Sequence, residues 1–138
     1  MDKNKAKELL SFHSTRNSDI DSPKWENGFL GSLRPFRGEL HKENFIEVME
    51  CLRVLKNEFS APTIEQGLVS DIVSIIHLTR AWASPYGMLG ENHLLTDEQT
   101  KHLLAWVDII ETCFMFLLED VQDEAFTEYK NYLNDKYF

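Results

Sequence analysis

Apolar residues recur at helical spacing through most of the chain. The clearest pattern spans residues 42–59, where apolar positions fall three or four residues apart and mark one face of a helix: Phe45, Val48, Met49, Leu52, Leu55 and Phe59. Ala61 and Pro62 end this pattern, because proline cannot continue a helix. A second pattern covers residues 63–83 with the stripe Ile64, Leu68, Ile72, Ile75, Thr79 and Trp82. Both segments are predicted to be long amphipathic helices.

The second half of the chain predicts two further helices. Residues 96–118 begin with Thr96 and Gln99, which match a capping box, and are apolar nearly all round. A helix of that kind is usually central and covered on most sides, so we expect this helix and 63–83 to form the inner pair. Residues 121–136 carry aromatic residues on one side and acids on the other, and a shorter first helix is expected over residues 2–13.

These elements predict an all-α fold, a bundle of four to five helices in a single domain over residues 1–138. No sustained period-two alternation indicates a strand. Residues 14–41 form a long loop after the first helix, in which Ser22 and Pro23 favour a short helix through about Phe29. Large apolar residues in this loop favour burial, namely Trp25, Phe29, Leu30, Leu33 and Phe36.

Composition makes a folded, soluble protein the expectation. The chain has 138 residues, of which 43% are hydrophobic, and it lacks a long apolar run that could span a membrane. The amino terminus has no apolar stretch like that of a secretory signal. Cys51 and Cys113 both lie within apolar helical patterns, so we expect reduced core thiols and a cytoplasmic location.

Charge is distributed unevenly along the chain. Residues 1–60 contain equal numbers of basic and acidic side chains, so the net charge of −9 comes from residues 61–138. An acidic half repels phosphate backbones, which argues against nucleic-acid binding. It favours a basic protein as partner, and the alternative is an acidic surface that serves only solubility.

The first functional hypothesis is therefore a non-enzymatic protein-binding module, an acidic inhibitor or immunity-type protein that neutralises a basic partner such as a toxin. In size and charge the chain is similar to small bacterial immunity proteins, a likeness that rests on no motif. The predicted contact residues lie near the end of the chain and combine acids with tyrosines, which suit interfaces: Glu119, Asp120, Asp123, Glu124, Glu128, Tyr129 and Tyr132. The alternative for this cluster is a solvated helix face.

The second hypothesis is a helical domain that binds a small anionic ligand between the loops 33–41 and 80–93, with an enzymatic role left open. Its residues would be Arg34, Arg37, His41, His77, Arg80, Trp82 and Tyr86. The competing interpretation is that the arginines bind the protein's own carboxylates, because Asp71 and Asp108 lie within very apolar helices.

The sequence gives little indication of a catalytic, metal or cofactor site. Glu98 and His102 share a helix face, but two ligands bind a metal weakly, and no catalytic, metal-binding or cofactor-binding motif is found. We therefore assign no catalytic residue, no metal and no cofactor. A homodimer built on the aromatic last helix, which ends in Lys136, Tyr137 and Phe138, is a third interpretation.

Overall fold

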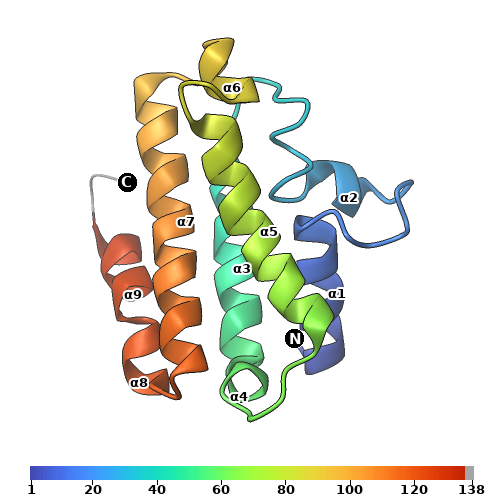
Figure 1. Cartoon of the computed structure of the whole chain (residues 1–138), viewed down its shortest axis with the longest axis vertical. Helices are drawn as coiled ribbons and strands as arrows, with labels where there is room; N and C mark the ends of the chain where they lie inside the picture. The colour runs from blue at the N-terminus through green and yellow to red at the C-terminus, as the bar shows by residue number, and fades with distance from the viewer. Residues whose placement is uncertain (136–138) are drawn as a thin grey trace.

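The computed structural model describes residues 1–135, and the chain folds into packed helices without a strand in that range (Figure 1). Five helices have eight residues or more: α1 (Lys3–His13), α3 (Lys42–Val54), α5 (Gln66–Ala83), α7 (Asp97–Leu118) and α9 (Thr127–Asn134). Four short ones join them: α2 (Pro23–Asn27), α4 (Lys56–Phe59), α6 (Met88–Glu91) and α8 (Gln122–Ala125). The all-α prediction is confirmed, although the number of helical segments exceeds the four to five expected.

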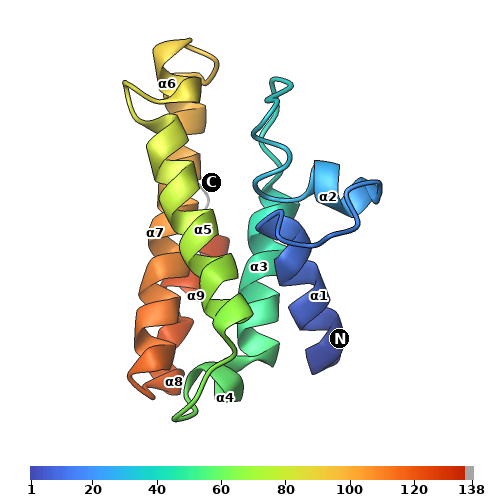
Figure 2. The ribbon, with the colours of Figure 1, turned by 45° about the vertical axis from the view of Figure 1, so that its right-hand side comes forward.

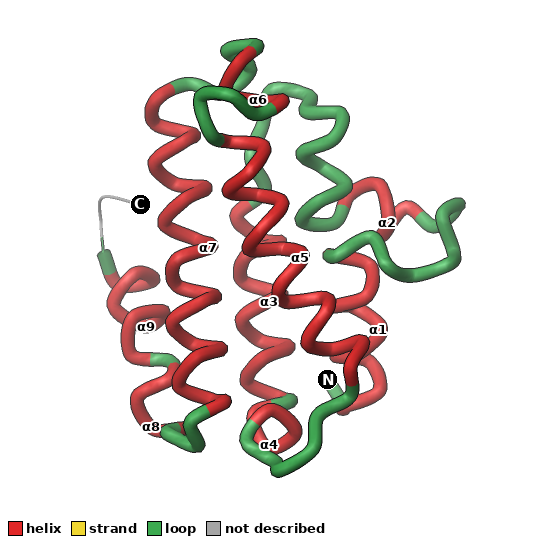
Figure 3. Tube along the Cα trace, in the orientation of Figure 1, coloured by secondary structure: helices red, strands yellow, loops and turns green. Residues whose placement is uncertain are grey.

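The extra segments arise where predicted long helices are interrupted. The predicted helix 42–59 breaks at Leu55, which has φ −97° and ψ 9°, and α4 follows as one more turn. The predicted helix 121–136 breaks in the same way at Phe126, which separates α8 from α9. Both residues are buried, so the break turns their side chains into the core. Figure 3 shows these joints as short interruptions between red segments.

The helices pack in two antiparallel pairs around one core. Figure 2 shows α1 and α3 on one side, and α5 and α7 on the other. The six apolar positions predicted for the 42–59 stripe are all buried to 1% exposure or less. The capping box at Thr96 forms as predicted, with Gln99 N–H donating to the Thr96 hydroxyl over 3.1 Å. The helix α7 was expected to be covered on most sides, but Met115 and Leu118 on it remain nearly half exposed.

An aromatic cluster fills the core between α3, α7 and α9. The Phe45 ring stacks on Trp106 at 5.7 Å between ring centroids, and Tyr129 and Tyr132 meet Phe45 edge-on. Trp106 Nε1 donates a hydrogen bond to the Tyr132 hydroxyl over 2.6 Å. The buried polar ends of these rings are thus paired with each other, as buried polar groups require.

The long loop 14–41 is ordered over the end of α1. His13 is buried and binds this loop twice, because its carbonyl accepts from Leu30 N–H and its Nδ1 accepts from Phe29 N–H. Phe29, Leu30 and Leu33 enter the core, as their apolar character predicted. The predicted short helix forms as α2, with Ser22 as its N-cap and Pro23 in its first turn.

A buried carboxylate joins α1 to α5. Asp71 is fully buried and accepts from Arg16 Nε at 2.6 Å, from the second terminal nitrogen of Arg16 at 3.0 Å, and from the Ser14 hydroxyl at 2.7 Å. The Arg16 guanidinium passes Gly67, where an added Cβ would lie 3.1 Å from Cζ. The sequence predicted an internal arginine for Asp71 but placed it at Arg34, Arg37 or Arg80.

Both cysteines lie in the core without a disulfide. Cys51 and Cys113 are fully buried, and burial raises the pKa of each thiol to about 12. Among residues 1–135, no helix combines the length and apolar character that crossing a bilayer requires.

We predict that removing the buried carboxylate strongly destabilises the fold. Asp71→Ala leaves Ser14 and Arg16 without their shared acceptor and should lower the free energy of unfolding by about 3 kcal/mol. Asp108→Ala, which removes an exposed carboxylate, should cost about 1 kcal/mol or less. Urea denaturation followed by circular dichroism measures both values. Equal losses in the two variants would contradict the anchoring role of Asp71.

We also predict that both thiols are unreactive in the native protein. A pKa of about 12 leaves almost no thiolate near pH 8, and burial blocks the reagent. Ellman's reagent should therefore modify Cys51 and Cys113 only as the protein unfolds, whereas protein in concentrated guanidinium chloride reacts within minutes. Rapid modification of either native thiol would contradict this placement.

Candidate functional site

The five acids predicted to bind a partner gather where α7 ends and α8 and α9 begin (Figure 1). All five are exposed, and we call them the acidic surface: Glu119, Asp120, Asp123, Glu124 and Glu128. Glu119 is the C-cap of α7, whereas Asp123 and Glu124 lie in α8 and Glu128 in the first turn of α9. The chain reverses direction at residues 119–121, so that α8 and α9 pack back against α7.

The acidic surface is a group of neighbouring carboxylates without counter-ions in the described residues. Within residues 1–135, none of its five carboxylates forms an ion pair. Elsewhere acids and bases pair readily, as Lys3 does with Glu58 across α1 and α4. Lys130 is the sole lysine or arginine from 112 to 135 in the sequence. The local negative charge is therefore largely uncompensated.

Hydrogen bonds from the α4 region hold this part of the chain in place. The Ser60 hydroxyl donates to the Leu117 carbonyl over 2.8 Å, which satisfies one carbonyl in the last turn of α7. Gln122 Nε2 donates to Asn57 Oδ1 over 2.9 Å and to Ser60 Oγ over 3.2 Å. The α4 region therefore holds the chain at Leu117 and at Gln122, on either side of Glu119 and Asp120 in the sequence.

The two tyrosines predicted for the contact surface are core residues. Tyr129 is 1% exposed and Tyr132 is 7% exposed, and both pack against Phe45. Burial raises the pKa of Tyr129 to about 12 and raises that of Tyr132 as well. Their position on the aromatic side of the last helix indicated this placement, but their residue type favoured an interface. The predicted surface is corrected to its acids.

Arg80 binds the protein's own acids. Its guanidinium donates to Glu111 at 2.8 and 2.9 Å and to Asp108 Oδ1 at 2.7 Å, across α5 and α7. These bonds raise the pKa of Arg80 and lower that of Glu111. The internal interpretation of this arginine is the one that the structure shows, although Asp108 is exposed and not buried.

The other residues of the anion-site hypothesis do not converge on one pocket. Arg37 donates to Glu26 over 2.8 Å, and His41 Nδ1 lies 3.2 Å from Glu43. The remaining residues differ in their surroundings: His77 is exposed on α5, Tyr86 is 93% exposed, and the Arg34 guanidinium lies 5.9 Å from the centroid of Trp82. The loops 33–41 and 80–93 do meet at Arg34 and Trp82, which the sequence left open.

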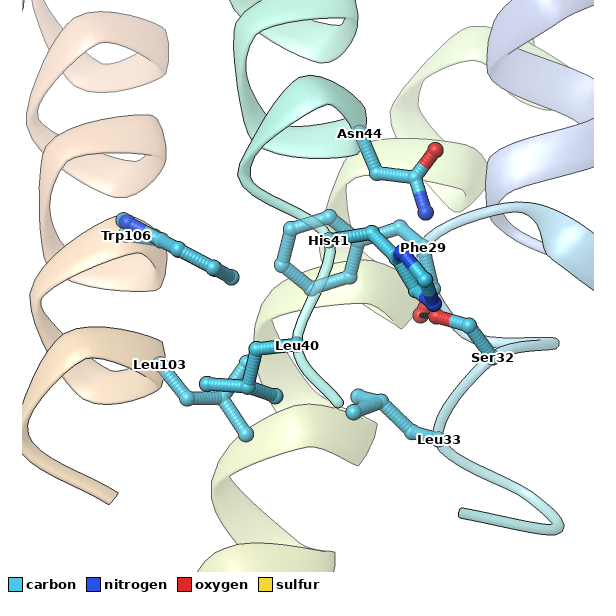
Figure 4. Close-up of a pocket in the computed structure, with 8 residues that line it drawn as sticks. All are labelled: Phe29, Ser32, Leu33, Leu40, His41, Asn44, Leu103 and Trp106. Atoms are coloured by element: carbon cyan, nitrogen blue, oxygen red, sulfur yellow. Dashed lines mark hydrogen bonds between the residues drawn. The ribbon is translucent and has the colours of Figure 1, made fainter. Parts of the chain in front are cut away.

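A narrow apolar hollow lies between the long loop and α7 (Figure 4). Figure 4 shows Leu103 and Trp106 of α7 on one side, Leu33 and Phe29 of the loop on the other, and Leu40 between them. Its cavity volume is about 10 Å³, far below the range of about 300–1,000 Å³ typical of small-molecule sites. We interpret it as incomplete packing under the loop.

A second hollow exposes a histidine–glutamate contact between α1 and α3. Its lining includes His13, Lys24, Asn44 and Glu47. His13 Nε2 lies 2.9 Å from Glu47 Oε1, and because Nδ1 accepts from Phe29 N–H, Nε2 is the donor. This bond lowers the pKa of Glu47. Both ring nitrogens of His13 are thus engaged in holding the loop and α3 together.

Candidate metal ligands are not grouped together in the part of the chain described. No three side chains of the types histidine, cysteine, aspartate and glutamate are grouped to hold a metal ion within residues 1–135. His102 Nε2 lies 3.6 Å from Glu98, as their shared helix face predicted. Sequence reasoning missed a third hollow, which lies between α7 and α9 beside the acidic surface and has Phe116 in its lining.

Comparison with known proteins gives no family assignment. No protein-family model, no curated protein and no solved structure matches this chain. The arrangement of charges and surfaces in this molecule therefore has to support a functional proposal by itself.

Proposed function

We propose that this protein is a binding module for a basic protein, a cytoplasmic inhibitor or immunity-type protein that neutralises its partner through the acidic surface. The observation that carries the proposal is the group of five exposed carboxylates without an ion pair in residues 1–135. A toxin that acts on nucleic acid is typically basic, so such a surface would attract it and compete with phosphate.

Two of the five acids, Glu119 and Asp120, lie at the end of α7, which is unfavourable for the isolated protein, whereas Asp123, Glu124 and Glu128 lie in the first turns of α8 and α9. Carbonyl groups give a helix C-terminus a partial negative charge, and a carboxylate there costs about 0.3–1 kcal/mol. Glu119 and Asp120 occupy this end of a 22-residue helix, whose last turn carries no basic residue. A basic partner would relieve this repulsion, so the arrangement favours binding over stability.

The backbone at Asp120 adds a second cost. Asp120 has φ +59°, a left-handed conformation that favours glycine. Asp120 N–H donates to the Leu117 carbonyl at 3.1 Å and Val121 N–H to the Phe116 carbonyl at 2.9 Å, so the helix ends in a Schellman motif. Glycine is the residue usually found at that position, yet this chain places a carboxylate there.

The first test of the proposal is capture of a basic partner from lysate of the native host on immobilised protein. The surface variant carries Glu119→Gln, Asp120→Asn, Asp123→Asn and Glu124→Gln, which remove four charges with little change in shape. We expect retention of the basic partner to fall at least about tenfold, and the partner held by the unchanged protein to elute as salt rises.

A matched control removes the same charge from exposed acids elsewhere that form no ion pair: Asp19→Asn, Asp21→Asn, Glu39→Gln and Glu91→Gln. This control should retain the partner to within about twofold at the same salt, because the lost charges lie outside the contact surface. Equal retention by the surface variant and the unchanged protein would refute the proposal.

A second prediction concerns the opposing effects of Asp120 on stability and binding. Asp120→Gly should raise the free energy of unfolding by about 1–2 kcal/mol, because it relieves both the left-handed backbone and the repulsion at the helix end. Asp120→Asn relieves mainly the repulsion and should gain less. Urea unfolding measures both, and the proposal also requires weaker partner binding by each. A glycine variant no more stable than the unchanged protein would show that Asp120 carries no such cost.

A further inference from the structure

The hollow between α7 and α9 forms an open groove at the edge of the acidic surface, with a volume of about 290 Å³. We call it the α7–α9 groove, and its lining residues come from three helices: Thr112 and Phe116 of α7, Glu124 of α8, and Thr127, Glu128 and Asn131 of α9. Figure 1 shows α8 and α9 lying along the lower half of α7, which places the groove on that side of the molecule.

The lining combines an aromatic ring with two carboxylates. Phe116 is half-buried and packs against the core, so its ring is a fixed apolar wall. Glu124 and Glu128 are exposed, and neither forms an ion pair within residues 1–135. The methyl groups of Thr112 and Thr127 add apolar surface. A ligand that fits must present an apolar stem and a positive, hydrogen-bonding head.

The protein already binds its own arginines with this chemistry. The Arg80 guanidinium is held by two carboxylates, Glu111 and Asp108, three residues apart on α7. The Arg53 guanidinium lies 4.9 Å from the centroid of the Phe126 ring. The α7–α9 groove offers a carboxylate pair and an aromatic ring together, but the described structure supplies no cation to it.

We propose that the α7–α9 groove receives an arginine side chain of the basic partner protein, an inference that rests on the function proposed above. The planar guanidinium can lie against Phe116 while its donors reach Glu124 and Glu128. Lysine fits less well, because its ammonium is a compact, strongly hydrated charge without a planar face. Met115, nearly half exposed beside Phe116, offers apolar contact to residues that flank the arginine.

A peptide titration followed by nuclear magnetic resonance tests the groove without the natural partner. The probe is the acetylated, amidated peptide Lys-Ala-Arg-Ala-Lys, added to isotope-labelled full-length protein. We expect amide resonances of Thr112, Phe116, Thr127 and Asn131 to shift and to saturate. The same peptide with citrulline in place of arginine, which keeps the shape and removes the charge, should leave these resonances in place. A lysine replacement should bind at least about threefold more weakly.

Variants locate the binding site. Glu124→Gln and Glu128→Gln should each weaken the arginine peptide about fivefold or more, whereas Glu119→Gln, which removes an equal charge outside the groove, should change binding less than twofold. These side chains are exposed, so all three variants should keep the dispersed spectrum of the folded protein.

These experiments distinguish a failure of the α7–α9 groove from a failure of the proposed function. Shifts confined to residues 119–123, unaffected by Glu128→Gln, would overturn the groove and leave the acidic surface as the binding region. A peptide that shifts no resonance of the groove would also overturn it, and partner capture with the four-charge surface variant would still decide the function by itself. A partner that is retained through the acidic surface but indifferent to Glu128→Gln would argue for another contact.

Discussion

The fold depends on one buried carboxylate that has no solvent contact and three hydrogen bonds. Asp71 is the sixth residue of α5, on the face that Leu68, Ile72 and Ile75 bury, and its charge would be costly there without partners. Arg16 and Ser14 provide them from the turn that ends α1, so the first helix is fixed against the fifth. Gly67, one turn before Asp71, leaves the space through which the guanidinium passes. His13 then fixes the following loop to the end of the same helix, so one short segment, 13–16, connects three parts of the molecule.

This use of basic residues explains the electrostatic asymmetry of the surface. Most bases of the first sixty residues pair with nearby or facing acids, as Arg16 does with Asp71, Lys7 with Glu65 and Arg37 with Glu26. In the second half, Arg80 is held by α7 acids. The five acids of the acidic surface form no ion pair within residues 1–135, and their mutual repulsion is screened only by solvent and salt. The excess of acids in the second half of the sequence thus appears in the folded protein as a group of carboxylates without ion pairs at the acidic surface.

The helical spacing of apolar residues predicts the helices and most of the core, because a helix with one buried face requires apolar residues at that spacing. The stripe of α3 and the capping box of α7 could be read from residue types alone. The sequence placed Asp71 within a very apolar helix, but its partner Arg16 lies 55 residues away in a turn, which no local pattern specifies. Tyr129 and Tyr132 were assigned to a surface from their chemistry although their helical positions indicated the core. The α7–α9 groove could not be predicted, because its lining comes from three helices. The sequence did not indicate the break at Phe126 that separates α8 from α9.

The end of α7 carries two carboxylates in an electrostatically unfavourable position and is held by hydrogen bonds from the α4 region. Ser60 and Asn57 bind Leu117 and Gln122, so the repulsion among Glu119, Asp120 and their neighbours is not relieved by movement of the chain. Asp123, Glu124 and Glu128 lie in first turns, where the helix dipole favours a carboxylate, but Glu119 and Asp120 lie at a helix C-terminus, and glycine would suit the left-handed position of Asp120 better. Fixed, unpaired charges instead retain their attraction for a cationic partner without first having to be ordered. This combination of rigidity and uncompensated charge is what a preorganised binding surface requires.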